Sequence, residues 1–379
     1  MDVTVIGSLE EVSATEWNVL ADESNPFIRH EFLVALERHH CVGPRHGWVP
    51  QHILIHDKGK LVGAVPMYLK DNSYGEFVFD WAWAHAYERA GLKYYPKLVV
   101  GVPYTPAPSQ RILVEKNPHC DAIANLLIDA AQQHANNLGV SSLHWLFTTE
   151  QETSLLEARG LLRRTGCQFH WNNKGYTHFD DFLETFTAQK RKKVKRERRR
   201  IEEAGIEIEI LNGGEITASQ WQIFHRFYEL TFHTKGGIPT LTLDFFNEIG
   251  RTMAENIVLV LAKYQGRYVA GAFNIRGKDT LFGRHWGCDA EFHSLHFEAC
   301  YYQGIDYCIQ QGLKHFQPGA QGEHKVSRGF EPTLTYSAHW IGNPSFRKAI
   351  ADFLKHEQIG VNEYKQELDD HLPFKLTSG

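Results

Sequence analysis

The segment that decides the fold runs from Leu281 to Phe330 and reads LFGRHWGCDAEFHSLHFEACYYQGIDYCIQQGLKHFQPGAQGEHKVSRGF. Its apolar pattern predicts a strand at residues 281–287, a helix at about 294–311 and a short strand at 314–317. A glycine-rich polar loop follows at 319–330. Ser294 and Gly312 are residue types that favour the beginning and the end of such a helix. The order indicates an α/β unit with a polar loop after its last strand.

Glu298 is the most informative residue of the predicted helix. At 100° per residue it lies in the middle of the face that carries Tyr301, Tyr302 and two isoleucines. A carboxylate on an apolar face must pair with a cation, bind a proton or take part in chemistry. Two interpretations follow: Glu298 is a catalytic group, or it forms a structural ion pair with an arginine.

More titratable residues surround Glu298 in the sequence, both before the helix and in the loop after it. They are Arg284, His285, Asp289, Glu323, His324, Lys325 and Arg328. Such a group beside strand ends and glycines predicts a functional site. We expect Glu298 and the residues of the 319–330 loop to converge with Arg284 or His285.

The composition narrows the class of protein. A chain of 379 residues is long enough for two domains, and its net charge of −5 predicts no general attraction to nucleic acid or anionic membrane. The six cysteines form no CxxC pair, which indicates free thiols in a reducing compartment. The first residues lack the apolar core of a signal peptide, and no apolar run approaches the ~20 residues that cross a bilayer. We therefore expect a soluble cytoplasmic protein without membrane insertion.

The two halves of the chain share one order of predicted elements. Asp57-Lys58-Gly59-Lys60 and Gln265-Gly266-Arg267 each join two apolar strands, as in a β-hairpin. A helix that ends at Gly139 and the helix that ends at Gly312 each lead into a closing strand. We predict an α/β (α+β) fold with two tandem domains, at residues 1–175 and 176–345. Each has a mixed twisted sheet flanked by helices.

Three details complete this scheme. One continuous strand is expected at Leu61–Tyr68, and another strand at Glu76–Trp81. Residues 346–379 are expected to form a helical tail in two segments, broken near Gly360 and packed on the second domain.

The second domain begins with a very basic run. Residues 190–200, KRKKVKRERRR, contain nine Lys and Arg residues, and apolar residues recur at helical spacing from Phe182 to Ile201. This predicts an amphipathic helix at 182–204. Like charges four residues apart destabilise a helix unless an anion binds to them. The pattern therefore favours phosphate or RNA binding over a solvated linker. The residues concerned are Lys190, Lys192, Lys195, Arg196 and Arg199.

Four stretches of the chain are distinctive: Phe79-Asp80-Trp81-Ala82-Trp83, Tyr94-Tyr95-Pro96-Lys97-Leu98, residues 295–302 and residues 318–330. They resemble the FemAB-like proteins, labelled peptidoglycan biosynthesis/recognition, within the acetyltransferase-like (GNAT) superfamily. The resemblance covers almost the whole chain and implies two GNAT-like domains. It also implies transfer of an amino acid from aminoacyl-tRNA to an amine of a cell-wall peptide precursor. Lys325 and Arg328-Gly329-Phe330 stand where Fem enzymes have a Lys-x-x-Phe-Gly-like loop, although the spacing differs.

Acyl transfer to an amine requires a base, stabilisation of an oxyanion and two substrates held together. The chain has no G-x-S-x-G motif, which favours direct attack in a ternary complex over a covalent enzyme. The candidate catalytic residues are Glu298, Glu323, His324 and Tyr302. The candidate substrate-binding residues are Arg284, His285, Asp289, Lys325, Arg328, Lys97 and Tyr104.

The donor and two rival functions stay open at this point. Coenzyme A is the usual donor of the superfamily, and Arg284–Asp289 resembles its phosphate loop but ends in an acid. We therefore favour a tRNA-type donor, with acyl-CoA as the alternative cofactor. His285, Cys288, His293 and His296 have none of the standard metal-ligand spacings, so no metal is expected. A non-catalytic module that binds peptidoglycan fragments through the aromatic segment Trp81–Tyr104 is the third possibility.

Overall fold

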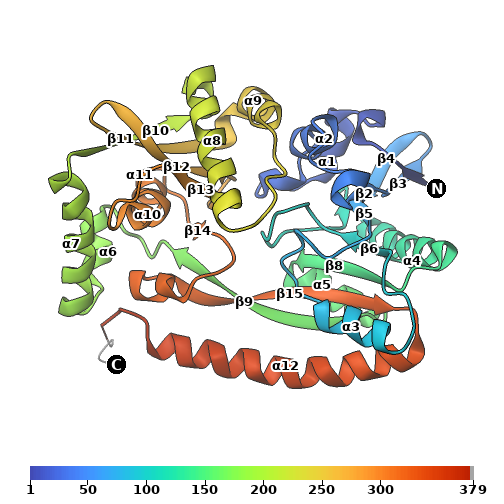
Figure 1. Ribbon diagram of the computed structural model, residues 1–379. Coiled ribbons are helices and arrows are strands. Elements are labelled where there is room, and N and C mark those ends of the chain that lie inside the picture. The colour runs from blue at the N-terminus through green and yellow to red at the C-terminus, as the bar shows by residue number, and fades with distance from the viewer. Residues whose placement is uncertain (376–379) are drawn as a thin grey trace. The chain divides into compact units, whose positions relative to one another are not determined.

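The computed structural model describes residues 1–375 (Figure 1). The chain divides into two compact units. Unit 1 contains residues 1–23, 27–167 and 334–364, and unit 2 contains residues 24–26, 168–333 and the chain from 365 onward. The expected domain limits at residues 175 and 345 stay a prediction.

Unit 1 contains two groups of strands. The first is a four-stranded sheet in the order β1 (Asp2–Ile6), β3 (His52–Asp57), β4 (Lys60–Val65) and β7 (Leu113–Val114). The second runs in the order β2 (Val49–Pro50), β5 (Met67–Lys70), β6 (Lys97–Val100), β8 (Ser142–Thr148) and β15 (Glu331–Ile341). The helices are α1 (Ala14–Leu20), α2 (His30–Arg38), α3 (Trp81–Arg89), α4 (Cys120–Leu138), α5 (Glu150–Ala158) and most of α12 (Pro344–Asp370). The apolar face of α4 packs on both groups of strands and forms the core.

Unit 2 is built on one run of strands. Its order is β10 (Ile206–Asn212), β11 (Ile257–Tyr264), β12 (Arg267–Arg276), β13 (Thr280–Cys288), β14 (His315–Gln317) and the second part of β9 (Leu162–Asn172). Residues 162–167 of β9 belong to unit 1. The helices are α6 (Phe179–Glu184), α7 (Ala188–Glu203), α8 (Ala218–Thr234), α9 (Leu243–Thr252), α10 (Leu295–Phe297) and α11 (Gln303–Gln310). Its core joins α6, α7 and α11 to β14 and to the segment after it.

The shared order of elements is present in both units. Each predicted hairpin turns through two residues with positive φ, at Lys58 and Gly59 in unit 1 and at Gln265 and Gly266 in unit 2. This backbone matches the twist of the flanking strands. Each unit also has a parallel strand pair joined through a helix, β6 with β8 and β13 with β14. The expected α/β class is confirmed.

Two predicted strands of unit 1 are wrong. The strand expected at Leu61–Tyr68 is interrupted at Pro66, and β4 and β5 on either side of it join different groups of strands. A proline has no N–H to donate within a sheet, which explains the break. Residues 76–80 form a loop and Trp81 begins α3, because the acids of this segment are bound to the buried Lys97.

The C-terminal tail also differs from the expectation. α12 is one continuous helix through Gly360, since a glycine inside a helix costs only about 1 kcal/mol. Its first half packs in unit 1 rather than on the second half of the chain. There Ile350 and Leu354 join Trp83 and Tyr87 of α3 in one apolar cluster.

Candidate functional site

The helix expected at 294–311 is irregular in its first half. α10 passes into a π-helix at Glu298–Tyr302 before α11 begins. Ser294 occupies the N-cap position, as expected, but its φ is +76° and its side chain makes no capping bond. A π-turn holds an extra residue and changes where the neighbouring side chains point. Glu298, Tyr301 and Tyr302 all lie on this turn and are buried.

Glu298 forms an ion pair with Arg198. An ion pair with an arginine was one of the two interpretations of this residue. Its Oε1 accepts hydrogen bonds from Nε of Arg198 (3.2 Å) and from Nε2 of Gln303 (2.7 Å). Arg198 also contacts Asp306, with 3.0 Å between Nη2 and Oδ2. Burial raises the pKa of Glu298 and Arg198 opposes this shift. Glu298 Oε2 has no hydrogen-bond partner among the described residues.

A second ion pair joins α7 to the 3₁₀ segment η7 (Glu323–Arg328). Glu197 accepts from Nη2 of Arg328 at 2.9 Å and from its Nε at 3.2 Å. The hydroxyl of Tyr302 donates to the same carboxylate, and the Arg328 guanidinium lies 3.4 Å from the centre of the Phe297 ring. Glu197 and Arg328 are 5% and 3% exposed, so this is a buried charge pair with several hydrogen bonds.

Hydrogen bonds hold two further residues of η7, His324 and Lys325. Nη1 of Arg328 donates to the carbonyl oxygen of His324 (2.8 Å), and Nε2 of His324 lies 2.8 Å from the Tyr301 hydroxyl. Lys325 is buried and donates to the carbonyl oxygen of Gly319 (2.8 Å). Burial lowers the pKa of Lys325 to about 8 and lowers that of His324 as well. A neutral imidazole and a weakly basic amine therefore lie on one short turn.

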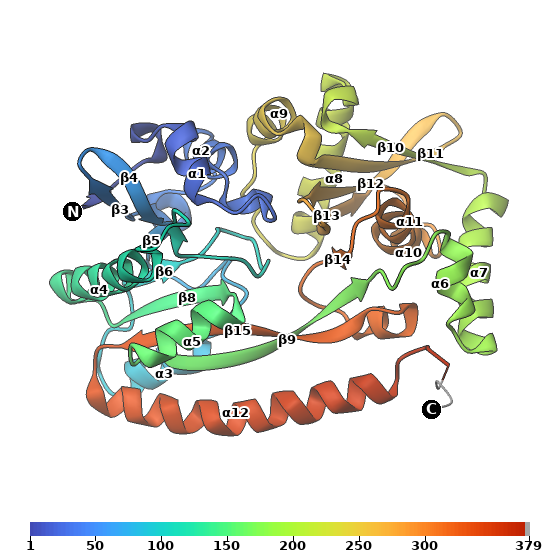
Figure 2. The ribbon, with the colours of Figure 1, turned by 180° about the vertical axis from the view of Figure 1, so that it is seen from behind.

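The basic helix α7 adds further positive charge to that of Lys325 and Arg328. Figure 2 shows α7 beside α6 in unit 2. The predicted helix is interrupted at residues 185–187, so α6 and α7 are separate. Lys192, Lys195, Arg196 and Arg199 are exposed, and Lys190 is half-buried. Two of these basic side chains have acidic partners: Lys195 pairs with Asp180 and Arg199 with Glu203. Burial and the positive charge of Arg328 lower the pKa of Lys193. This lysine of α7 therefore lies close enough to Arg328 to be affected by its charge.

The other predicted residues of unit 2 have different surroundings. The ring of His285 packs against Tyr228 and Phe232 of α8 and Phe273 of β12. Asp289 pairs with Arg226 of α8, with 3.1 Å between Nη2 and Oδ2. Arg284 is half-buried on β13, and Glu323 is exposed at the start of η7. The described contacts of His285 and Asp289 are thus with α8 and β12 rather than with η7.

Sequence reasoning missed two residues of α7, Glu197 and its neighbour Arg198. Glu197 is the single acid in the run 190–200, and that isolated acid among nine basic residues was the available signal. It lies on the buried side of the helix with Val194 and Ile201. Arg198 faces Glu298, and nothing in the local pattern distinguishes it from the other basic residues.

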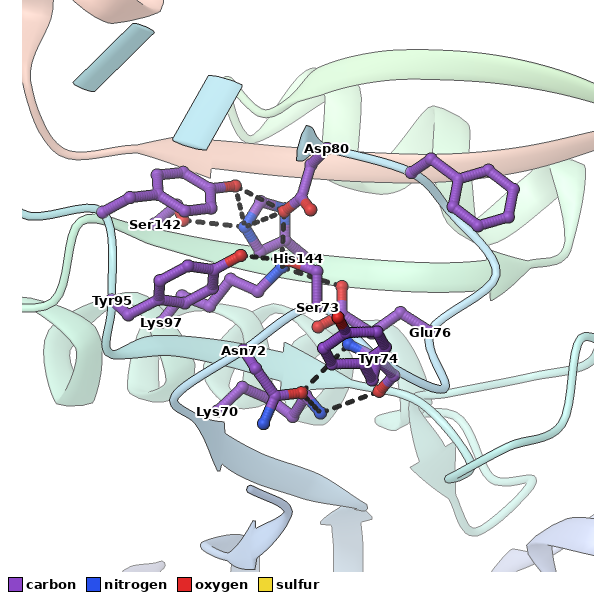
Figure 3. Close-up of polar contacts among 12 residues, drawn as sticks. Lys70, Asn72, Ser73, Tyr74, Glu76, Asp80, Tyr95, Lys97, Ser142 and His144 are labelled. Carbon is purple, nitrogen blue, oxygen red and sulfur yellow. Dashed lines mark hydrogen bonds and ion pairs between the residues drawn. The ribbon is translucent and has the colours of Figure 1, made fainter. Parts of the chain in front are cut away.

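Unit 1 contains a second buried polar cluster, which includes the predicted residue Lys97 (Figure 3). The ammonium of Lys97 donates to Ser73 Oγ and Glu76 Oε2, each at 2.8 Å, and to Asp80. The Lys97 side chain is fully buried. Burial alone would lower the pKa of Lys97, but the two carboxylates raise it. Burial also raises the pKa of Glu76 to about 7. Burial acts in the same direction on Asp80, but Lys97, His144 and Ser73 together lower its pKa to about 2.

Histidines extend this cluster across unit 1. The Tyr94 hydroxyl donates to Asp80 (2.5 Å) and lies 3.3 Å from Nε2 of His144. Nδ1 of His144 is 2.6 Å from Nδ1 of His339. Burial lowers the pKa of His144 to about 3, so the histidine stays neutral. The predicted residue Tyr104 donates to the carbonyl oxygen of Cys41 (2.8 Å) and its ring contacts Trp48.

Residues 1–375 contain neither a candidate metal centre nor a helix that could span a membrane. No three His, Cys, Asp or Glu side chains of this part of the chain are placed to hold a metal ion. None of its helices has the length and the apolar character that crossing a membrane requires.

Comparison with known proteins identifies relatives of the whole chain. The sequence profile of the FemAB-like family, described as peptidoglycan biosynthesis/recognition, matches residues 8–376. Among curated proteins no significant sequence match is found.

Solved structures share the fold at low sequence identity. FemX has a TM-score of 0.55 at 11% identity, over 93% of this chain and 100% of its own. L-PGS from Bacillus licheniformis has a TM-score of 0.51 at 11% identity, over 91% and 94% of the two chains. The C-terminal domain of a putative lysylphosphatidylglycerol synthetase from Agrobacterium fabrum has a TM-score of 0.53 at 10% identity, over 91% and 95%. Together with the repeated elements, these matches confirm the fold of two GNAT-like domains.

Proposed function

The chain belongs to the FemAB-like family of peptidoglycan biosynthesis/recognition, and from this premise we propose that it is an N-acyltransferase. It moves an aminoacyl group from a tRNA-type donor to an amine of a small-molecule or peptide acceptor, such as a cell-wall peptide precursor. The observation that carries this proposal is the arrangement of His324, Lys325 and Arg328 on one turn, held by the π-helix and by the basic helix α7.

His324 is the base of the proposed reaction. It is exposed, so an acceptor can reach it, and its lowered pKa keeps the ring neutral near pH 7. Tyr301 engages Nε2, while Nδ1 has no partner among the described residues. Nδ1 takes the proton of the acceptor amine as its nitrogen attacks the ester carbonyl carbon. The same nitrogen returns the proton to the leaving 3′-hydroxyl when the C–O bond breaks.

Lys325 and Arg328 supply positive charge to this reaction. Lys325 has one hydrogen bond, to Gly319, and no carboxylate partner among the described residues. A buried cation of this kind stabilises the oxyanion that develops on the carbonyl oxygen. Arg328 is held by Glu197 and Tyr302, and in turn it holds the main chain of His324. We therefore assign Tyr302 and Glu197 a positioning role.

The donor binds along the exposed side of α7. Between residues 188 and 203 this helix has nine basic and three acidic residues, in a chain whose overall charge is −5. A phosphate backbone needs such a local row of cations, and binding releases counterions from the nucleic acid. Lys190, Lys192 and Arg196 have no acidic partner among the described residues, which leaves their charge available. This favours a tRNA-type donor over coenzyme A.

Binding of unacylated tRNA tests the donor. We compare Lys192→Glu/Lys195→Glu with the control Lys348→Glu/Lys355→Glu, which makes the same charge change at exposed positions of α12. The first variant should weaken binding and reduce the slope of log K against log salt by about 1.5, from ~0.7–0.9 for each phosphate contact. The control should keep the wild-type slope. Equal effects of the two variants, or calorimetric binding of coenzyme A by a wild type that ignores tRNA, would overturn the proposal.

A further inference from the structure

We propose that the open edge of β1 (Asp2–Ile6) is a self-association surface, which pairs antiparallel with β1 of a second copy of this chain. The whole strand belongs to unit 1. The proposal is therefore independent of acyl transfer, whose assigned residues lie in unit 2.

β1 lies at the edge of its sheet. It pairs with β3 along one side and is the first strand in the order β1-β3-β4-β7. Within residues 1–375, no hydrogen bond joins Asp2–Ile6 to an element other than β3. An antiparallel strand directs its N–H and C=O groups to both sides. One row of these groups is therefore open to a further strand.

β1 also has apolar side chains that its own sheet leaves exposed. Val3 and Val5 are 42% and 41% exposed. They lie opposite Ile55 and Ile53 of β3, which are fully buried in the core that α4 covers. Because residues opposite each other in a ladder point to the same face, the two valines extend this core to the edge of the sheet. A further strand on this edge covers them.

β1 lacks the features by which edge strands are commonly protected from pairing. Those features are proline, lysine and β-bulges that bend the strand away. Residues 2–6 contain no Pro or Lys, and their single charge, Asp2, is at one end. The register with β3 continues from Asp2 to Ile6 without a shift. The edge of β1 is therefore regular along its whole length.

The sequence of β1 is complementary to itself. When two antiparallel copies are centred on Thr4, each Val3 lies opposite Val5 of the second copy, and the two Thr4 residues lie opposite each other. Pairs of β-branched residues and of threonines stabilise antiparallel strands. This register has a two-fold axis, as in most homodimers. Each copy uses its one β1 edge, so the association ends at a dimer.

Charge favours a second copy over an unrelated strand. Lys58 is exposed at the turn between β3 and β4, beyond the Asp2 end of β1. Glu11 is exposed shortly after the Ile6 end. Neither has a partner of opposite charge within residues 1–375. Antiparallel pairing places the Asp2 end of one copy beside the Ile6 end of the other, which brings these opposite charges to the same end of the interface.

The size of the interface indicates its strength. β1 has five residues, so a pair of these strands buries less than the roughly 1,200–2,000 Å² of stable complexes. We therefore expect a weak dimer that dissociates on dilution.

Sedimentation velocity over a range of protein concentrations tests the proposal. The variant is Val5→Lys, which replaces an exposed valine of β1. The control is Ile359→Lys, which makes a similar change at a 58% exposed residue of α12 in the same unit. The wild type and the control should dimerise with the same Kd. Val5→Lys should raise the Kd about tenfold, because the two-fold axis changes two cross-strand pairs at once.

Cysteine cross-linking tests the register. Thr4→Cys places two thiols opposite each other, whereas Val3→Cys places each thiol opposite Val5 of the second copy. Oxidised glutathione accepts the two electrons and two protons that the thiols lose when the disulfide forms. It should link Thr4→Cys chains into covalent dimers and link Val3→Cys chains much less, because a disulfide needs Cβ atoms about 3.5–4.5 Å apart. The wild type, with its six cysteines, gives the background.

Three results would overturn the proposal. The first is a wild type that sediments as a monomer at every concentration. The second is a dimer that Val5→Lys weakens no more than Ile359→Lys does. The third is cross-linking of Val3→Cys as efficient as that of Thr4→Cys. Loss of tRNA binding in the α7 variants has no bearing on any of these outcomes.

Discussion

Replacing Glu197 by glutamine tests how the site of unit 2 is held together. The carboxylate makes two hydrogen bonds to Arg328, at 2.9 and 3.2 Å, and a third to the hydroxyl of Tyr302. A hydrogen bond to a charged group contributes about 1.5–3 kcal/mol, and removing one member of a buried ion pair costs about 3–5 kcal/mol. Glutamine keeps one oxygen as acceptor. We therefore expect Glu197→Gln to lower the free energy of unfolding by about 3 kcal/mol.

The same helix provides a matched control. Glu203 pairs with Arg199 at 3.4 Å, and both side chains are 66% exposed. Exposed pairs of this kind contribute about 0.3–0.5 kcal/mol, so Glu203→Gln should change stability little. Urea unfolding followed by circular dichroism measures both variants. The double variant Glu197→Gln/Arg328→Met should be less destabilised than the sum of its single changes, because no buried charge is left without a partner.

One result would refute this reasoning. If Glu197→Gln and Glu203→Gln lose the same small amount of stability, Glu197 does not hold Arg328 in solution. The positions assigned to His324 and Tyr302 would then lose their support as well, because both depend on Arg328 and its partner.

Three further predictions concern the buried residues Glu298, Lys97 and His144. Glu298→Gln should cost about 1–3 kcal/mol of stability, because Arg198 then keeps only Asp306 as a carboxylate partner. It should lower the rate of acyl transfer less than His324→Gln does. Equal losses of activity in the two variants would indicate that Glu298 is the base. Lys97→Met should cost about 3–5 kcal/mol in thermal unfolding, and neutralising Glu76 and Asp80 as well should recover part of it; no recovery would contradict the ion-pair account. Unfolding free energy should fall as the pH drops from about 6.5 toward 3, because unfolded His144 binds a proton that the folded residue, with a pKa of about 3, does not. That proton contributes about 1.4 kcal/mol per pH unit, and the slope should be smaller by this amount in His144→Asn.

The parts of the fold that follow local rules were predictable from the sequence. The hairpins at Gly59 and Gly266 need positive φ, and the sequence places glycines there. The helix that ends at Gly139 is fixed by its apolar face and by the left-handed glycine after it. The basic helix followed from spacing alone, although its first turn belongs to the separate α6.

The parts that depend on distant partners were not predictable. Glu197 meets Arg328 across 131 positions of sequence, and no local pattern shows which of many basic residues the acid selects. The π-helix at Glu298–Tyr302 is invisible to a regular helical wheel, so the wheel placed Glu298 correctly on a buried side but gave no partner. The strand expected at 76–81 failed for the same reason. Its acids are drawn to Lys97, which lies on another strand.

Assigning a function to His324 also required the structure. In the sequence His324 is one of 22 histidines, and its interest came only from its neighbours in the loop. The contact of its Nε2 with Tyr301 and the bond from Arg328 to its main chain distinguish it from the others.

The central claim is that this chain transfers an aminoacyl group from tRNA to an amine, with His324 as the base. The most direct measurement incubates the protein with tRNA charged with radiolabelled amino acids and with a lysine-containing cell-wall peptide precursor, and then follows label that becomes bound to the precursor in an alkali-stable amide. The wild type should produce this label, and His324→Gln, with its fold intact, should not. Acyl transfer from acetyl-CoA to the same precursor, with no label from aminoacyl-tRNA, would contradict the account.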